Sequence, residues 1–329
     1  MELTVIIPTR DRQAILAETL SRLEQESDDV AFEVIVVDDG STDGTPDAVK
    51  RRASGQSYPL TLVEQARAGP AAARNRALAS ARTPVCLFID DDSWPRKGLL
   101  SRHRDFHRRQ PKLEAALLGR IALPRRPAPT AFMRWLSSAH IDYEGIEDAG
   151  DAGGDHFFTG NVSAKTAFLR DAGGFDERFT DHEDIELGLR LEQRGLRLVY
   201  DPDAAVEHYS PTDLTRTLAR MGSVGRSLAL LADCHPGYPV PRPPGARHRV
   251  KAGLLTCLAA IGVRHGAVQR ETWRFLCHEA LREAYWKVVD GDSSPRPRSG
   301  TDLRIGRALS RLASRDVEAR MPSGALPPA

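Results

Sequence analysis

The stretch PVCLFIDDDSWP, residues 84–95, joins a continuous apolar run to three adjacent carboxylates. A short apolar run of this kind is typical of a strand buried on both faces, as in a parallel sheet covered by helices. Three neighbouring carboxylates repel one another, so a cation or hydrogen-bond donors must compensate them. Hard divalent ions such as Mg²⁺ and Mn²⁺ bind carboxylate and phosphate oxygens together. The stretch therefore predicts a buried strand that ends either in a metal and diphosphate site or in a solvated acidic turn.

Strand-like and helical patterns alternate along the chain before this stretch. Apolar runs rich in β-branched residues occupy 3–8, 32–37 and 60–64. Apolar residues at helical spacing between 15 and 23, and an alanine-rich segment at 70–81, lie between strand-like runs. The order β-α-β-α-β-α-β predicts an α/β fold with a parallel sheet. Ligands in such sheets bind beyond the carboxyl ends of the strands, where helix N-termini converge.

Polar residues follow two other strands at that edge. The sequence PTRD follows the first strand at 8–11, and DDGS follows the second at 38–41. With the acidic triplet at 90–92, three predicted strand ends have polar residues. These side chains are candidates for one common site.

Less regular sequence follows the alternating region. Residues 124–155 are rich in Pro, Gly and acidic residues around one apolar patch at 132–136, which predicts a mobile connection or lid. A strand is predicted at 157–163, a helix at 181–194 that ends before Gly195, and a further strand at 196–200.

A second acidic cluster, HEDIE at 182–186, stands at the start of the predicted helix. The positive end of a helix dipole favours carboxylates and lowers their pKa values. Helix capping alone could explain this cluster.

The C-terminal part is predicted to be helical after residue 212. The proline-rich run HPGYPVPRPP at 235–244 suggests a boundary, and the polar tail from 291 contains one amphipathic stretch at 303–312. The apolar run 252–263 is too short to span a bilayer and favours a core helix. From residue 212 onward 19 Lys and Arg stand against 10 Asp and Glu, a basic excess that indicates either a partner surface or an ordinary solvated face.

Composition and charge exclude several classes of protein. The 329 residues, 41% hydrophobic and 28% charged, are typical of a soluble globular protein, and a net charge of +1 argues against a dedicated nucleic-acid binder. The four cysteines show no CxxC or Cys/His spacing, and the N-terminal sequence has no signal-peptide pattern. We therefore expect a cytoplasmic protein with reduced thiols.

Seven stretches, taken in order, resemble family 2 glycosyltransferases over roughly residues 2–210. They are VIIPTRDR, VIVVDDGSTDGT, GPAAARNRALASA, CLFIDDDSWP, FFTGNVSAKTAFLRDAGGFDERF, HEDIELGLRL and VYDPDAAVEH. The resemblance implies a GT-A (Rossmann-like) fold, with a mixed, mostly parallel sheet flanked by helices. It also implies a catalytic domain at 1–210, a helical C-terminal region at 211–290 and a partly disordered polar tail at 291–329.

The resemblance further implies the positions that bind the donor. A nucleoside-diphosphate sugar would be bound through its nucleotide by Pro8, Thr9, Arg10, Asp39, Arg74, Asn75, Asp90 and Asp91. A simple surface salt bridge is the alternative for Arg74. Mn²⁺ or Mg²⁺ would be held by Asp92 together with His208 and Asp90.

The same resemblance implies the catalytic and sugar-binding positions. In the family's inverting members a carboxylate of the ED pair deprotonates the acceptor hydroxyl, which favours Asp184 as base, with Glu183 as second candidate. Positions near the donor sugar or the acceptor would be Gly160, Asn161, Trp94 and His182.

Substrates are less well defined. UDP is the favoured nucleotide with GDP and dTDP open, and the acceptor would be a glycan, a lipid-linked molecule or a small molecule. The QxxRW element of processive synthases is absent from the sequence, and no long transmembrane segment is seen. Both observations favour an enzyme that adds a single sugar. Peripheral contact with the inner face of the membrane and homo-oligomer formation stay open. A sugar-nucleotide pyrophosphorylase and a non-catalytic nucleotide-sugar binding protein are the alternatives.

Overall fold

The computed structural model describes residues 1–26, 30–140, 143, 145–241 and 266–289. The chain divides into two compact units, one formed by 1–130 with 136–210 and the other by 131–135 with 211–329. The expected core helix at 252–263, the amphipathic stretch at 303–312 and the rest of the tail lie outside the described residues.

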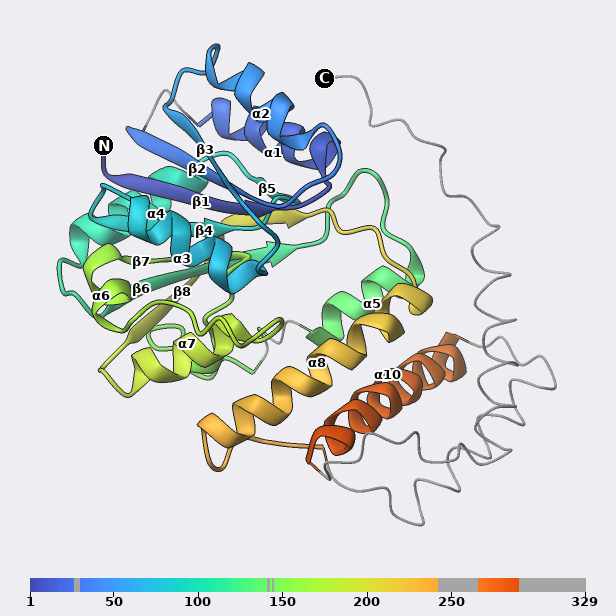
Figure 1. Cartoon of the computed structure of the whole chain (residues 1–329). Coiled ribbons are helices and arrows are strands. Elements are labelled where there is room, and N and C mark those ends of the chain that lie inside the picture. The colour runs from blue at the N-terminus through green and yellow to red at the C-terminus, as the bar shows by residue number, and fades with distance from the viewer. Residues whose placement is uncertain (27–29, 141–142, 144, 242–265, 290–329) are drawn as a thin grey trace. The chain divides into compact units, whose positions relative to one another are not determined.

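In the described part of the first unit, eight strands form one sheet in the order β3-β2-β1-β4-β7-β6-β8-β5 (Figure 1). β1 to β4 are parallel, β7 is antiparallel to both of its neighbours, β6 and β8 are parallel, and β5 is antiparallel to β8. The expected mixed, mostly parallel sheet is confirmed. The strands are β1 (Leu3–Thr9), β2 (Phe32–Asp39), β3 (Leu60–Gln65), β4 (Val85–Ile89), β5 (Ser93–Pro95), β6 (Ala115–Ala122), β7 (Asn161–Lys165) and β8 (Arg197–His208).

Helices cover both faces of the sheet because successive strand residues point to opposite sides. Val5 and Ile7 pack in the core formed with α1 (Gln13–Glu24), α2 (Thr45–Ala53) and α4 (Leu99–Arg109). Ile6, between them, packs in the other core with α3 (Pro70–Ser80), α6 (Thr166–Asp171) and α7 (Glu183–Glu192). Burial on both faces explains why these strands are apolar throughout.

Several boundaries differ from those predicted. β5 and β6 have no counterpart among the predicted strands, and β7 begins at Asn161 rather than at residue 157. β8 does not end at 200, because after an irregularity between Gly119 and Arg120 it pairs again with β6 and then with β5. The segment 124–155 contains the helix α5 (Ala131–His140) and reaches the short 3₁₀ helix η1 (Gly154–His156).

In the second unit, α8 (Leu214–Cys234) packs against α10 (Gly266–Val289). The two helices approach closely at Gly225, where an added Cβ would lie 2.6 Å from the Cβ of Ala284. The rings of Phe132 and Trp135 contact that of Trp273 in the same unit. None of the helices within the described ranges is long and apolar enough to cross a membrane.

A second close approach positions α7 in the first unit. A Cβ on Gly188 would lie 2.0 Å from the carbonyl oxygen of Gly154 and 2.6 Å from the Cβ of Phe157. Glycine at 188 therefore lets α7, which begins with the ED pair, rest directly on η1.

Replacing Gly188 by alanine should destabilise the first unit. The new methyl group must push η1 away from α7, which we expect to lower the free energy of unfolding by about 1–3 kcal/mol. Chemical denaturation followed by circular dichroism measures the effect. Gly222→Ala is the matched control in α8, because its Cβ would meet only the Arg226 guanidinium at 3.7 Å and should stabilise its helix by up to about 1 kcal/mol. Equal stability of Gly188→Ala and wild type would contradict this packing.

Candidate active site

The site lies where the carboxyl ends of β1, β2, β4 and β8 meet the beginning of β7. Because β7 is antiparallel to β4, Asn161 pairs with Ile89, so the turn before β7 lies beside the acidic triplet. Gly160 belongs to that turn, and a Cβ on it would lie 3.4 Å from Oδ2 of Asp90. The predicted strand-end residues therefore do gather at one edge of the sheet.

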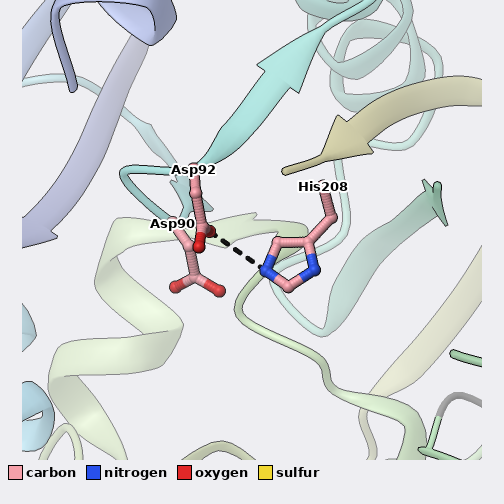
Figure 2. A group of neighbouring side chains, drawn as sticks. All are labelled: Asp90, Asp92 and His208. Atoms are coloured by element: carbon pink, nitrogen blue, oxygen red, sulfur yellow. Dashed lines mark ion pairs between the residues drawn. The ribbon is translucent and has the colours of Figure 1, made fainter. Parts of the chain in front are cut away.

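Asp90, Asp92 and His208 form a candidate metal centre (Figure 2). Each offers one ligand atom, and these atoms all lie within 4.8 Å of one another. Asp92 Oδ1 is 3.0 Å from His208 Nε2. Two carboxylates and one imidazole suit a divalent ion such as Mn²⁺ or Mg²⁺.

The backbone brings His208 to Asp92. His208 ends β8 and pairs with Ser93 of β5, and the Tyr209 amide donates to the Asp92 carbonyl at 2.8 Å. Burial alone would raise the pKa of Asp92, but His208 and Arg12 more than offset it and hold that pKa well below its usual range. The charge of Asp92 in turn raises the pKa of His208 against the effect of burial.

Arg12 is a site residue that the sequence analysis missed. Its Nη1 lies 3.2 Å from Asp91 Oδ1 and also contacts Asp92. Arg10, which was predicted instead, forms its ion pair with Asp11 at 3.5 Å. Both arginines follow β1 two residues apart, and only the tertiary structure shows which one turns toward the triplet.

Asp91 is tied into the structure. Its Oδ2 accepts a 2.7 Å hydrogen bond from Thr9 Oγ1, and burial raises its pKa to about 7 although Arg12 opposes this. Thr9 and Asp91 therefore bond each other through these atoms, and their predicted nucleotide contacts stay predictions. Pro8 lies half-buried within β1.

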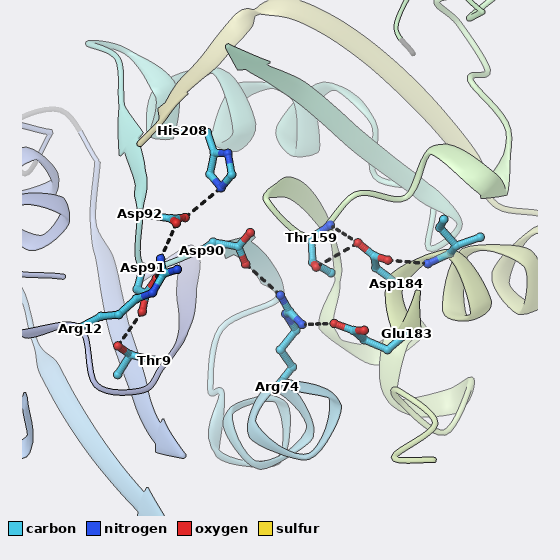
Figure 3. A network of polar contacts seen from close by, with 11 residues as sticks. Thr9, Arg12, Arg74, Asp90, Asp91, Asp92, Thr159, Glu183, Asp184 and His208 are labelled. Carbon is cyan, nitrogen blue, oxygen red and sulfur yellow. Dashed lines mark hydrogen bonds and ion pairs between the residues drawn. The ribbon is translucent and has the colours of Figure 1, made fainter. Parts of the chain in front are cut away.

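Arg74 joins the triplet to the ED pair (Figure 3). Its Nη2 donates to Asp90 Oδ1 at 2.9 Å and its Nη1 donates to Glu183 Oε1 at 2.7 Å. The residue is only 4% exposed, so the alternative of a surface salt bridge is wrong. Burial raises the pKa of Glu183 to about 7, against the opposing effect of Arg74.

Asp184 lies beside this bridge and is held by Thr159, a second residue that the sequence analysis missed. Oδ2 of Asp184 accepts from the Thr159 amide at 3.1 Å and from its Oγ1 at 3.2 Å. Oδ1 accepts from the Ile185 amide at 2.9 Å. His182, the residue before the ED pair, adopts the left-handed backbone conformation with φ 63° at the start of α7. Thr159 directly precedes Gly160 in the sequence FFTGN. Its position next to the predicted turn is the feature by which the sequence could have identified it as a site residue.

Two residues predicted to contact the nucleotide hold loops beside the site. Asp39 accepts from Gln65 Nε2 and from the amides of Ala68 and Gly69, so its carboxylate holds the loop before α3. Asn75 bonds both backbone groups of Phe175 and so holds the loop before α7. These hydrogen bonds shape the walls of the site through backbone positions.

Two residues predicted to lie near the sugar have buried side chains. The side chain of Asn161 is completely buried, with its amide bonded to Arg120 O, Ala204 O and His103 Nε2. Trp94 is 2% exposed and stacks on Tyr209 with ring centroids 4.7 Å apart. Both side chains lie in the core of the structure, whereas Gly160 lies next to Asp90.

Removal of the Arg74 bridge should be costly in stability. Arg74→Met leaves buried Glu183 without its cation, and we expect a loss of about 3–5 kcal/mol in the free energy of unfolding. Adding Glu183→Gln to this variant should restore part of the loss, because no buried charge then lacks a partner. Arg76→Met, at an exposed position of the same helix, is the control and should change stability by less than about 0.5 kcal/mol. Additive effects of the two substitutions at 74 and 183 would argue against the bridge.

Comparison with known proteins agrees with this geometry. Residues 4–122 match the model of glycosyl transferase family 2. A pre-mycofactocin glycosyltransferase of Mycobacterium tuberculosis is 31% identical over 241 residues, which are 73% of this chain and 49% of that protein. A validoxylamine A glucosyltransferase of Streptomyces hygroscopicus subsp. jinggangensis is 31% identical over 226 residues, 59% of this chain and 52% of that protein. The chain spans about half the length of these curated relatives.

Solved structures show the same fold. The mannosyltransferase PcManGT of Pyrobaculum calidifontis, in complex with GDP-Man and Mn²⁺, aligns with a TM-score of 0.54 at 21% identity, over 99% of this chain and 76% of that one. TarS of S. aureus aligns with a TM-score of 0.52 at 18% identity, over 87% of this chain and 55% of that one. From the family match, the relatives and the shared sheet, the chain belongs to glycosyltransferase family 2 and has the GT-A fold.

Proposed function

We propose that the protein is a metal-dependent, inverting glycosyltransferase that moves one sugar at a time from a nucleoside-diphosphate sugar to an acceptor hydroxyl. The observation that supports this most is the Arg74 bridge. It places the candidate metal ligand Asp90 and the ED pair on two sides of a single guanidinium. In such a site, the metal bound near Asp90 would neutralise the charge of the leaving group. The carboxylates of the ED pair would supply the base that activates the nucleophile.

In the proposed reaction Asp184 accepts the proton of the acceptor hydroxyl while that oxygen attacks the anomeric carbon. The bond to the nucleoside diphosphate breaks on the opposite face, which inverts the configuration. Thr159 fixes the direction of the Asp184 carboxylate, and Gly160 leaves room for the sugar next to Asp90. A divalent metal held by Asp90, Asp92 and His208 would offset the charge on the departing diphosphate.

The donor and acceptor are proposed by class. UDP is the favoured nucleotide, and dTDP stays open. GDP stays open as well, because one structural neighbour was solved with GDP-Man and Mn²⁺. A relative named for validoxylamine A supports a small-molecule acceptor, beside a glycan or lipid-linked one. Residues 1–210 would be the catalytic domain, and the helices from 211 to 290 would bind the acceptor, a second copy or a membrane surface.

A nucleotide screen tests the donor site. With Mn²⁺ present, the cognate nucleoside diphosphate should stabilise the protein by about 2.7 kcal/mol at a hundredfold excess over its dissociation constant. Melting temperatures measured with UDP, GDP and dTDP, each with Mn²⁺ or EDTA, give the answer. The increase should be larger with metal than with EDTA. If none of the three nucleotides raised the melting temperature in Mn²⁺, the proposed donor site would be wrong.

Two substitutions separate the two sides of the site. Asp184→Asn should lower kcat for transfer by about 10²–10⁴-fold, since it removes the general base, and leave nucleotide affinity unchanged. Asp92→Asn should weaken Mn²⁺-dependent nucleotide binding by about tenfold or more. Released nucleoside diphosphate reports the rate and calorimetry reports the affinity. An equal loss of nucleotide affinity in both variants would refute Asp184 as the base.

Thr159 is expected to act through Asp184. Thr159→Val removes the hydroxyl donor to Oδ2 while keeping the shape of the side chain, so kcat should fall by about tenfold with little change in KM for the donor. Thr159→Ser keeps the hydroxyl and should recover most of the rate. A Thr159→Val enzyme with the rate of wild type would show that the backbone amide alone suffices to orient the base.

A further inference from the structure

A chain of hydrogen bonds between α4 and β7 has no part in the proposed reaction. Asn161 Nδ2 is 3.1 Å from Arg120 O and 2.8 Å from Ala204 O, so both of its hydrogens are donated to carbonyls. The Asn161 Oδ1 atom must then accept from His103 Nε2, at 3.1 Å. All three amide positions of this buried side chain are thereby used.

The donor direction continues through the next two residues. Because His103 Nε2 donates, its Nδ1 accepts from Ser163 Oγ at 2.7 Å, and Ser163 accepts from His107 Nε2 at 2.9 Å. Burial lowers the pKa of His103 to about 4 and that of His107 to about 3, which keeps both rings neutral, as this order of donors requires. The hydrogen bonds thus run in one consistent direction from His107 of α4 to the amide of Asn161.

The two carbonyls that Asn161 holds lie at an irregularity between β6 and β8. Gly119 pairs with Asp201, but the next residue of β6, Arg120, pairs with Ala205, so three residues of β8 bulge out between them. The amide fills the space at this point, because a Cβ on Gly119 would lie 2.2 Å from Asn161 Nδ2 and 2.2 Å from Ala204 O. Asn161 therefore replaces ladder hydrogen bonds that the bulge removes.

The position of this bulge determines where His208 points. Beyond the bulge β8 pairs in regular register through Val206 and Glu207 to His208, which lies opposite Ser93 and beside Asp92. Side chains alternate between faces along a strand, so a shift of one residue would turn His208 away from Asp92. The register of β8 is therefore a condition for the candidate metal centre.

We propose that His103 is a positioning residue, which locks the β6–β8 bulge through Asn161 and thereby places His208 in the metal centre. This inference rests on the proposed metal-dependent function. It assigns a role to the His103, Ser163 and Asn161 chain, which the reaction itself does not use.

The test measures Mn²⁺ binding alone, by electron paramagnetic resonance of the free ion, in the full chain without nucleotide. His103→Leu removes the donor to Asn161 and should weaken Mn²⁺ binding by about tenfold, the effect typical of residues that orient metal ligands. His103→Gln, whose amide can still donate to Asn161, should recover most of the affinity. His107→Leu is the matched control, since it removes an equally buried imidazole from the same helix but leaves the bonds of His103 to Ser163 and Asn161 intact.

A double-mutant cycle separates positioning from general damage. In a His208→Ala background, His103→Leu should weaken Mn²⁺ binding no further, because its effect passes through His208. An additive loss in that background, or wild-type affinity in folded His103→Leu, would overturn the proposal. If His103→Leu does not fold, Ser163→Ala replaces it, because this substitution removes the hydrogen bond to His103 Nδ1. The same loss of Mn²⁺ affinity is expected, and wild-type affinity would again overturn the proposal.

Hydrogen exchange gives a readout that needs no metal. In His103→Leu the amides of residues 201–209 should exchange faster while those of β1 and β2 stay unchanged. If the wild-type protein binds no Mn²⁺, the metal centre of the proposed function is refuted. The exchange result alone then decides whether His103 holds the bulge between β6 and β8. Unchanged exchange at 201–209 would refute the lock even if the metal centre stands.

Discussion

The rest of the site depends on one buried guanidinium. Arg74 lies in the first turns of α3 and reaches carboxylates on both sides, Asp90 at the end of β4 and Glu183 at the start of α7. A charge in such a place is tolerated only when it is paired and hydrogen-bonded. The pairing therefore fixes how far the strand end and the helix start can stand from each other.

The acidic triplet is neutralised residue by residue rather than by solvent. Asp91 is bonded to Thr9 and Arg12, Asp92 to Arg12 and His208, and Asp90 to Arg74. These partners differ in kind, and so do their consequences. Asp91 is closed off in the interior, while Asp90 keeps about a third of its side chain exposed next to Gly160. Exposure sets Asp90 apart from the other two carboxylates, while Asp92, which is as buried as Asp91, is grouped with Asp90 because their ligand atoms lie close to that of His208. The burial of Asp91 and Asp92 removes the solvated acidic turn as an explanation of the sequence.

Sequence patterns predicted the first four strands and the strand-end residues because buried parallel strands must be apolar and their polar neighbours stand out. They could not decide between Arg10 and Arg12, since two arginines on one loop differ only in where the tertiary structure turns them. Asn161 was predicted near a sugar because the Gly160–Asn161 turn resembles a turn of the family that approaches the donor sugar or the acceptor. The structure buries the amide of Asn161 against Gly119, a contact between residues 42 positions apart that no local pattern contains. Asp39 and Asn75 each bond backbone groups of a loop distant in sequence, and their predicted nucleotide contacts stay predictions.

The direction of β7 assembles the two halves of the site. If β7 ran parallel to β4, its first residues would lie at the opposite edge of the sheet, and Thr159 and Gly160 would be far from Asp90. Because it runs antiparallel, its beginning meets the end of β4, and the ends of β6 and β8 come to the same edge. Next to β7, β6 and β8 regain their register only after the bulge between Gly119 and Arg120. A buried amide at this bulge is a physical solution, since it supplies two donors where the ladder has lost them. The beginning of β7 therefore contributes to two places: the turn before it lies beside Asp90, and its first residue, Asn161, holds the bulge between β6 and β8.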